Sequence, residues 1–556
     1  MAFRMLRLVE RPSPPALLDP VRVTDAKASE GPSAPPSRII LGFGLAGLLA
    51  LMLAAPALLP EIQFARLSTR AEPSLTYLLQ DSPSPADLLT FFGPQMRTVL
   101  GGIPVEFWEN NFYFGLWMLP LWAAAILIPW WSGSSRDALT SATRAGPKSA
   151  FLLALGIAVC AFLSFDTPVV RAFYDHFPGF NLFRQPSRLL LLAQAFAALL
   201  AGLGADALLG LRFLTRPARA AAAAGILLLA PVADAARLVR TLVATEPLNE
   251  VLPRHAFHEL LARDRNGGRV LALSLPDYPN IGRAALLYGT AGYYGIDMAN
   301  GVASLELKHY IEYFTVMEKG SAASIPHQPL GWTDCSRIAK PELLRALDVR
   351  YVIGDPRADL SGLAAQKVWE SRRTPVFLYF GGVYLVPIAV WRLEDPLGPA
   401  YFARSVRAVG SEDESLRLLA ASTSARDAIV FDPGGESARG IGLRDASAPQ
   451  AGGSASTPSA PPGSASWLER GYNRYRYRVD SPGRNFLILS QVWYPGWRAT
   501  LDGAPVRLYR TNHALLGCVV PGGSHQLVLE MTCPPLHTGI AAAGIAGIAI
   551  ALLLAL

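Results

Sequence analysis

The stretch IILGFGLAGLLALMLAAPALL, residues 39–59, decides the fold class of this protein. It contains no charged side chain. A helix that crosses about 30 Å of hydrocarbon needs roughly 20 mainly apolar residues, and it satisfies its own backbone polar groups. We therefore expect residues 39–59 to span a membrane.

The composition supports this interpretation for a large part of the chain. Of the 556 residues, 51% are hydrophobic and 17% are charged, and the mean hydropathy is +0.27. These values are too apolar for a soluble chain of this length. The apolar residues concentrate in the first 245 residues and the last 20, whereas the middle has an ordinary soluble composition. Two environments are therefore expected.

Five further segments are apolar enough to be predicted spans: 112–131, 150–165, 189–209, 220–243 and 536–556. The fourth of these is rich in alanine and is interrupted by Asp234, Arg237 and Arg240. Near the outer end of a span, Asp234 is expected to meet Arg237 or water and not to relay protons. If this segment did not cross, the large region after it would lie in the cytosol. With all six spans, the predicted fold is a polytopic α-helical membrane protein.

The basic residues predict the orientation of these spans. They cluster before the first span, between the second and third, and between the fourth and fifth. Positive charge near helix ends is retained on the cytoplasmic side, so residues 1–38 are expected to be a disordered cytosolic segment. The loops 60–111 and 166–188 and the region 245–535 then lie outside. Topology and anionic lipid head groups account for the net charge of +7, and no nucleic-acid-binding pattern is present.

The predicted extracytoplasmic region divides at residues 434–466, whose Gly, Ser, Ala and Pro content indicates a flexible linker. Before it, residues 246–433 mix helical and strand-like patterns, which predicts an α/β region. After it, residues 467–535 contain short strand candidates separated by turn pairs such as Asp502-Gly503 and Gly522-Gly523. These strands predict a β-sandwich-like module before the C-terminal transmembrane helix.

Cysteine and histidine spacing indicates no metal site. Cys160 lies in a predicted span, and Cys335, Cys518 and Cys533 would face an oxidising compartment, where at most one disulfide can form among the three. The eight histidines are scattered, and no CxxC or HExxH spacing occurs. The sequence therefore identifies no cofactor, and it leaves a divalent metal requirement open.

Six short motifs follow one another along the chain. They are Leu59-Pro60-Glu61 with Leu67-Ser68-Thr69-Arg70, Phe107-Trp108-Glu109-Asn110, Asn181-Leu182-Phe183-Arg184-Gln185-Pro186-Ser187-Arg188, Tyr294-Gly295-Ile296-Asp297, Leu347-Asp348-Val349-Arg350-Tyr351-Val352, and Trp493-Tyr494-Pro495-Gly496-Trp497-Arg498-Ala499. On these motifs, the chain from about residue 39 to its C-terminus resembles the YfhO-type bacterial membrane proteins. That family belongs to or borders the GT-C superfamily of polyprenyl-phosphate-sugar-dependent glycosyltransferases.

The resemblance implies a multi-pass protein of the bacterial inner (cytoplasmic) membrane that transfers sugar from a polyprenyl-phosphate-linked donor to a cell-envelope glycan acceptor. Members of the family begin with several more membrane helices, and GT-C enzymes place a catalytic acidic residue in the first outer loop of that portion. We therefore expect the chain to correspond to the C-terminal part of such an enzyme, either as a truncated sequence or as one chain of a split protein with a separate N-terminal catalytic subunit.

Two other classes of function stay open. One is a non-catalytic membrane protein that binds envelope glycans or assembles with a separate catalytic subunit. The other is a transporter, which is disfavoured because the six predicted spans show no internal repeat and about half of the mass lies outside the membrane.

Four charged residues are predicted to serve glycosyl transfer, which needs a carboxylate and cations that stabilise the departing phosphate. Arg184 and Arg188 lie four residues apart at the outer membrane boundary, where both could contact a lipid phosphate. Their alternative role is to anchor the chain by reaching the lipid head groups. Glu61 and Glu109 flank predicted spans and are candidate catalytic acids or bases, or else solvated loop carboxylates.

The aromatic group Trp493, Tyr494 and Trp497 is a candidate sugar contact, because a flat apolar ring suits the C–H face of a sugar. The alternative is that these side chains pack at a strand end beside Pro495-Gly496.

Overall fold

The computed structural model describes residues 36–434 and 463–555, with internal gaps. The gaps are most of 70–81, residues 92, 94–111, 132–146, 178–179, 181–185, 210–215, 243–246, 264–267, 274–289, 302–305, 323–336 and 379–381. The chain divides into two compact units: Met1–Leu59 together with Pro535–Leu556, and Pro60–Pro534.

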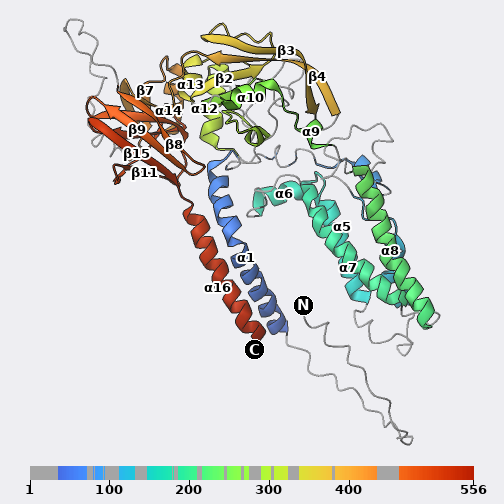
Figure 1. Ribbon diagram of the computed structural model, residues 1–556. Helices are drawn as coiled ribbons and strands as arrows, with labels where there is room; N and C mark the ends of the chain where they lie inside the picture. The colour runs from blue at the N-terminus through green and yellow to red at the C-terminus, as the bar shows by residue number, and fades with distance from the viewer. Residues whose placement is uncertain are drawn as a thin grey trace, which may run out of the picture. The chain divides into compact units, whose positions relative to one another are not determined.

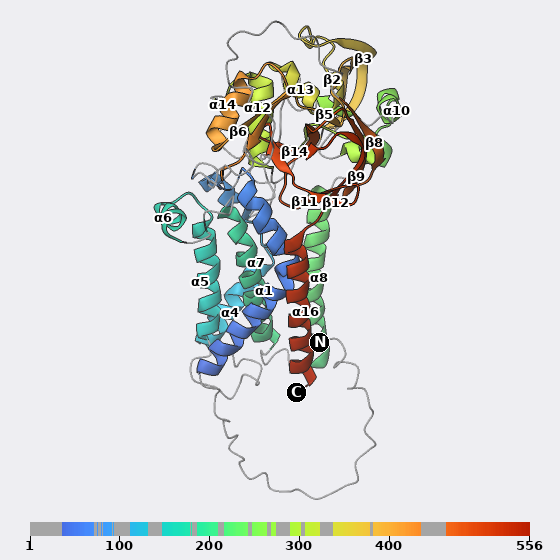
Figure 2. The same ribbon diagram turned by 90° about the vertical axis from the view of Figure 1, so that its left-hand side faces the viewer.

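The first unit is formed by two helices, α1 (Pro36–Leu67) and α16 (Pro534–Ala555), which lie side by side (Figure 1; Figure 2). The last turns of α1 belong to the second unit. A Cβ atom at Gly539 would lie 2.5 Å from the carbonyl oxygen of Ala55, so the backbones approach closely because Gly539 has no side chain. Small residues at the contact are typical of helix pairs in membranes.

The second unit begins with further apolar helices: α4 (Met118–Trp131), α5 (Pro147–Leu163), α7 (Leu190–Leu209) and α8 (Pro217–Leu242). Two glycines let α7 contact its neighbours. A Cβ at Gly204 of α7 would lie 1.8 Å from the carbonyl oxygen of Leu121 on α4, and one at Gly156 of α5 would lie 2.9 Å from the ring of Phe196 on α7. Helix α7 therefore packs between α4 and α5.

A short amphipathic helix, α6 (Pro168–His176), follows α5 at an angle of 85°. The side chain of Thr167 caps it by accepting a hydrogen bond from the backbone N–H of Val170 at 3.3 Å, and proline fits the first turn because that position needs no donor. The 3-10 helix η6 (Pro186–Leu189) leads into α7.

Within the described residues, four helices are long and apolar enough to cross a membrane: Gly44–Leu67, Pro186–Leu209, Pro217–Arg237 and Pro534–Ala555. The bent pair α5–α6 adds a fifth if it counts as one span, and α4 contributes a shorter apolar segment. Apolar helices joined to a mixed α/β part with several sheets are thus confirmed. The count of six spans and the extracytoplasmic placement stay predictions.

The α/β part is built around a four-stranded sheet. Its strands are β1 (Arg269–Ala272), β2 (Val349–Gly354), β3 (Ala365–Leu378) and β4 (Gly382–Leu393), in the order β1-β2-β4-β3. Strands β1 and β2 are parallel, and the other pairs are antiparallel. The associated short helices are α9 (Leu248–Val251), α10 (Ala256–Arg263), η8 (Thr290–Tyr294), α12 (Lys308–Lys319) and α13 (Pro341–Ala346).

Both faces of this sheet are buried. On one face Val352 packs with residues of α12 and α13, and on the other Ile353 packs with Phe257 of α10. Alternate residues of β2 therefore enter two different cores, which explains why the strand is an unbroken apolar run after Tyr351.

The remaining strands form two sheets. The six-stranded sheet has the order β5-β10-β14-β13-β7-β6 and contains β5 (Ala400–Phe402), β6 (Ser405–Val409), β7 (Asp427–Phe431), β10 (Asn485–Val492), β13 (Tyr509–Thr511) and β14 (Leu515–Val520). The five-stranded sheet has the order β12-β11-β15-β9-β8 and contains β8 (Ser464–Arg470), β9 (Arg474–Ser481), β11 (Trp497–Leu501), β12 (Ala504–Val506) and β15 (Gly523–Met531).

The two sheets share a buried core that includes Leu487 and Leu516 from the first sheet and Tyr477 and Leu527 from the second. The predicted hairpin turn at Asp502-Gly503 is confirmed, with φ values of 51° and 86°. Both residues adopt the left-handed region that a two-residue turn between twisted strands requires.

The predicted division into two modules at residues 434–466 is wrong. Strands β5 and β7 precede that segment, yet β5 pairs with β10 and β7 pairs with β13. Strand β8 already begins at Ser464. The sandwich therefore starts at Ala400 and takes strands from both sides of residues 435–462, which lie outside the described residues. Low-complexity composition marks a loop, but it gives no information on which strands pair across that loop.

One crossover element belongs to the sandwich. Helix α14 (Glu412–Ala421) connects the parallel strands β6 and β7, and Ser411 caps it by accepting a hydrogen bond from the backbone N–H of Glu414. The α/β part and the six-stranded sheet also share one core, in which Phe314 and Leu343 join Ile488 and Leu515.

Candidate functional site

The residues predicted for catalysis at the membrane are only partly described. Glu61 is exposed on the final turns of α1, because the helix continues past the predicted end of the span at residue 59 to Leu67. Arg188 is exposed on η6. Glu109 and Arg184 lie outside the described residues. The proposed pairing of Arg184 with Arg188 and the catalytic role of Glu61 and Glu109 stay predictions.

Asp234 on α8 is held by two neighbours. Its two carboxylate oxygens accept hydrogen bonds from the hydroxyl of Tyr113 at 2.8 and 2.9 Å, and Oδ1 lies 3.3 Å from Nη2 of Arg237. The predicted contact between Asp234 and Arg237 is confirmed. Because Tyr113 lies just before α4, its hydrogen bonds to Asp234 also hold the N-terminal end of α4 against α8.

Asp166, between α5 and α6, forms a two-pronged ion pair with Arg171, with distances of 2.9 and 2.8 Å. Asp87 is buried and accepts hydrogen bonds from the backbone N–H and the hydroxyl of Ser84. These carboxylates near the apolar helices therefore each have polar partners that hold them in place.

The aromatic group of the sandwich is half-buried and has packing partners. Nε1 of Trp497 donates a hydrogen bond to the carbonyl oxygen of Val492 at 3.1 Å. The hydroxyl of Tyr494 lies 3.4 Å from Oε1 of Gln63. Trp493 and Trp497 both pack against the core shared by the two sheets. This is the arrangement expected for packing, and sugar contact by these rings stays a prediction.

The cysteines of the described chain are free. Cys160 and Cys518 are buried and Cys533 is half-buried. Cys335 lies outside the described residues. Burial raises the pKa of the Cys518 thiol to about 12, so this thiol stays protonated and unreactive at neutral pH.

A pocket of about 1060 Å³ lies between α10 and the four-stranded sheet. Charged and aromatic side chains line it together: Glu259, Arg263, Arg350, Tyr351, Trp369, Arg392 and Glu394. The ring of Trp369 is positioned by Phe257, at a centroid distance of 5.2 Å. Two wall residues, Arg350 and Tyr351, belong to the motif at 347–352, although the sequence did not indicate that this motif faces a pocket.

Arg350 differs from the other two arginines of the pocket. Arg263 is mostly exposed and is paired with Glu259 at 3.0 Å, and Arg392 is exposed. Arg350 is half-buried, and within the described part of the chain its Nε atom has no hydrogen-bond partner. This Nε atom is buried and faces the carboxylate of Asp348, so a molecule in the pocket would meet the rest of the guanidinium group, which can donate to an anion through its terminal N–H groups.

Asp348 lies behind Arg350, with 4.0 Å between its Oδ1 and Nε of Arg350. Asp348 is buried and adopts φ 55°, which aspartate tolerates better than most residues. Burial raises the pKa of this carboxyl to about 6, although Arg269, Arg350 and Arg470 favour its charged form. The carboxyl group of Asp348, behind the pocket, therefore gains or loses its charge at mildly acidic pH.

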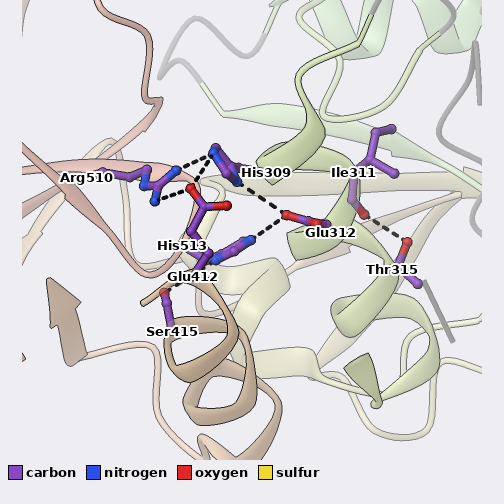
Figure 3. A network of polar contacts seen from close by, with 8 residues as sticks. All are labelled: His309, Ile311, Glu312, Thr315, Glu412, Ser415, Arg510 and His513. Atoms are coloured by element: carbon purple, nitrogen blue, oxygen red, sulfur yellow. Dashed lines mark hydrogen bonds and ion pairs between the residues drawn. The ribbon is translucent and has the colours of Figure 1, made fainter. Parts of the chain in front are cut away.

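A second polar centre lies where α12, α14 and the β13–β14 turn meet (Figure 3). Oε2 of Glu312 lies 3.3 Å from Nδ1 of His309 and 2.7 Å from Nε2 of His513. Burial opposes the charged form of Glu312, but the hydrogen bonds of the two histidines lower its pKa to about 2. These are three side chains of types that bind metals, within 4.8 Å of one another.

The sequence reasoning missed this centre. His309 and Glu312 are three residues apart on one helix, which is a weak local signal, but His513 follows 201 residues after Glu312. The scattered histidines were predicted to form no cluster, and the fold brings two of them together.

Comparison with known proteins gives a partial likeness. No protein-family model matches the chain, and no curated protein matches it. The structure of the arabinofuranosyltransferase AftD from Mycobacteria aligns with a TM-score of 0.31 and 13% identity, over 87% of this chain and 41% of that one. A mutant form of AftD aligns with a TM-score of 0.22 and 15% identity, over 89% of this chain and 51% of that one. The chain therefore spans no more than about half the length of these proteins.

Proposed function

We propose that the chain is part of a GT-C-like glycosyltransferase of the bacterial cytoplasmic membrane and that its large outer region binds the envelope glycan acceptor. The observation that carries this proposal is the pocket beside α10, where the half-buried Arg350 and the ring of Trp369 line the same space. The apolar helices and the YfhO-like motifs support the membrane and GT-C parts of the proposal.

The chemistry of the pocket suits an acidic glycan. Guanidinium groups bind carboxylates and phosphates through paired N–H donors. An aromatic ring packs against the apolar face of a sugar, and carboxylates such as Glu259 accept hydrogen bonds from sugar hydroxyls. Arg350 would thus bind the acid group of the glycan while Trp369 contacts a neighbouring ring.

In the same proposal the sugar donor is a polyprenyl-phosphate sugar held at the outer membrane surface. Arg184 and Arg188 would contact its phosphate, and Glu61 or Glu109 would act as the acid or base. Trp493, Tyr494 and Trp497 would add sugar contacts on the sandwich.

A second candidate is a non-catalytic subunit that binds glycan for a separate catalytic chain. It is favoured by the carboxylates Asp87, Asp166 and Asp234, each of which is held by a neighbouring side chain. A carboxylate that is already bonded in this way is a poor general base. In this case the catalytic acid would come from another chain.

A transfer assay separates the two candidates. Purified full-length chain in lipid nanodiscs would be mixed with a radiolabelled polyprenyl-phosphate sugar and an acidic envelope glycan. Transfer of label to the glycan that is lost in the Glu61→Gln, Glu109→Gln double variant supports the enzyme. Saturable glycan binding without transfer supports the subunit, and neither transfer nor binding would contradict both.

A further inference from the structure

In each histidine of the polar centre, one ring nitrogen faces Glu312 (the inner nitrogen) and the other (the outer nitrogen) contacts helix α14. Nε2 of His309 lies 3.4 Å from Oε1 of Glu412, and Nδ1 of His513 lies 3.3 Å from Oγ of Ser415. Glu412 and Ser415 are neighbours on successive turns at the start of α14. The inner nitrogens of both rings consequently face Glu312 (Figure 3).

This arrangement is the one found around metal-bound histidines. A ligating imidazole usually has its other ring nitrogen fixed by a carboxylate, a hydroxyl or a carbonyl, which sets the tautomer and the ring orientation. Here Glu412 and Arg510 contact the outer nitrogen of His309 and Ser415 contacts that of His513, while the inner nitrogens and a carboxylate oxygen of Glu312 converge.

We propose that His309, Glu312 and His513 bind one zinc ion, which joins α12 to the β13–β14 turn. Two imidazoles and one carboxylate are a common zinc ligand set, with a water molecule in the fourth position. With bonds of about 2.0–2.1 Å, ligand atoms around a tetrahedral zinc lie about 3.4 Å apart. The 3.3 Å between His309 and Glu312 fits this value, and the 2.7 Å between His513 and Glu312 would widen by less than about 1 Å.

The charge of the centre also favours a cation. With both imidazoles neutral, Glu312 and Glu412 are opposed by the guanidinium of Arg510, which leaves one net negative charge. Arg510 lies 2.9 Å from Glu412 and stacks over Phe431 at 4.0 Å, and it contacts the outer nitrogen of His309. The positive charge of Arg510 therefore lies beside Glu412 and the outer nitrogen of His309. Glu312 lies on the opposite side, against the inner nitrogens of the two histidines. A divalent ion would balance this buried carboxylate.

The backbone at His513 gives an independent reason to expect a function. His513 has φ 69° and its neighbour Asn512 has φ 48°. Non-glycine residues adopt this left-handed region uncommonly, and asparagine and histidine are among those that adopt it most often. A residue with this uncommon backbone conformation that is also almost completely buried is held in place by its contacts, and metal binding would supply such a contact.

The metal-free alternative uses the same atoms. Each histidine would donate its inner N–H to Glu312, and the outer nitrogens would accept hydrogen bonds from Arg510 and Ser415. This arrangement holds the same rings together without binding an ion, so measurement of bound metal distinguishes the two.

The experiment uses full-length protein in detergent, purified with a tag that contains no histidine. The protein is dialysed against zinc, and its metal content is measured by mass spectrometry. We expect about one zinc per chain, and a fall to background in the His513→Asn variant, where asparagine suits the positive φ and keeps the fold. The matched control is His525→Asn, because His525 pairs with Asp502 away from the centre.

Two further readouts do not depend on activity. Cobalt in place of zinc should give the visible absorption of a tetrahedral site in the native protein and in His525→Asn, and lose it in His513→Asn and in Glu312→Gln. EDTA should lower the melting temperature of the native protein and leave that of Glu312→Gln unchanged. Wild-type protein without stoichiometric zinc, or His513→Asn and Glu312→Gln with as much zinc as the native protein, would overturn the proposal.

Discussion

Oε2 of Glu312 lies 2.7 Å from Nε2 of His513, although 201 residues separate them in the chain. The contact joins α12, which covers the four-stranded sheet, to the turn between two strands of the sandwich. The same two parts also share a hydrophobic core, so the α/β region and the sandwich pack against each other along a common boundary. Substitutions at this boundary are therefore expected to affect both.

Asn512→Ala is predicted to destabilise this boundary. The side chain of Asn512 is buried, accepts a hydrogen bond from the N–H of Ile429 at 2.9 Å and donates one to the carbonyl oxygen of Ala425 at 3.2 Å. Alanine would leave both backbone groups unsatisfied and would disfavour φ 48°, at a cost of about 2–3 kcal/mol. Thermal unfolding should show a lower melting temperature, while Asn473→Ala, at an exposed position, should change little. An unchanged melting temperature for Asn512→Ala would contradict this account of the turn.

Gly539→Leu is predicted to separate α1 from α16. Even a Cβ atom at this position would lie 2.5 Å from the carbonyl oxygen of Ala55, so the two backbones would have to move apart. We expect a loss of about 1–3 kcal/mol, as for other overpacked sites. Gly544→Leu is the matched control, because a Cβ at Gly544 meets nothing within 4 Å. Cysteine cross-linking between the helices measures the effect, and equal cross-linking in both variants would contradict the predicted packing.

The stability of the α/β region is predicted to fall as the pH rises from about 4 to about 6. The folded-state pKa of Asp348 is about 6, above its ordinary value of 3.8, because the carboxyl is buried. Between these values the folded state binds more protons than the unfolded state, so raising the pH favours unfolding by up to about 3 kcal/mol.

Asp348→Asn tests this pH dependence, since asparagine keeps the side-chain shape and tolerates φ 55°. Melting temperatures measured between pH 4 and pH 7 should decline less steeply in this variant than in the native protein. Parallel profiles for the two proteins would show that Asp348 is not the titrating group.

The extracytoplasmic placement is predicted to be visible by cysteine labelling. Thr423 is exposed beside α14, and Ser37 is exposed at the start of α1. In intact cells a membrane-impermeant maleimide should label Thr423→Cys and should label Ser37→Cys only after permeabilisation, because positive charge retains the N-terminal segment inside. The opposite pattern would place the large region in the cytosol.

Local patterns in the sequence predicted the local structure well. Residues 39–59 and 536–556 are apolar over the full length of a helix, and Asp502-Gly503 combines two residues that tolerate positive φ. In each case the deciding interactions lie within a few residues. The helix ends were less predictable: α1 continues to Leu67 because the polar residues after Leu59 can extend a helix into water.

Long-range pairing could not be predicted in this way. Strand β5 has only three residues, and its partner β10 lies beyond the 434–466 segment. The pocket beside α10 likewise collects residues from a helix and three strands, so Arg350 and Trp369 share no local pattern. His309 and His513 are residues of a type that binds metals. They lie close together only because two sheets and two helices pack against one another.

The most direct test of the central claim is glycan binding at the pocket. Full-length protein in nanodiscs would be titrated with an acidic envelope glycan and with a neutral glycan of the same length, by isothermal calorimetry. We predict saturable binding of the acidic glycan that weakens about tenfold or more in Arg350→Gln, since a charge-assisted hydrogen bond contributes about 1.5–3 kcal/mol. Trp369→Ala should weaken it as well, and Arg373→Gln, exposed on β3 but not part of the pocket lining, should not. Absence of saturable binding, or equal binding by the native protein and Arg350→Gln, would contradict the account.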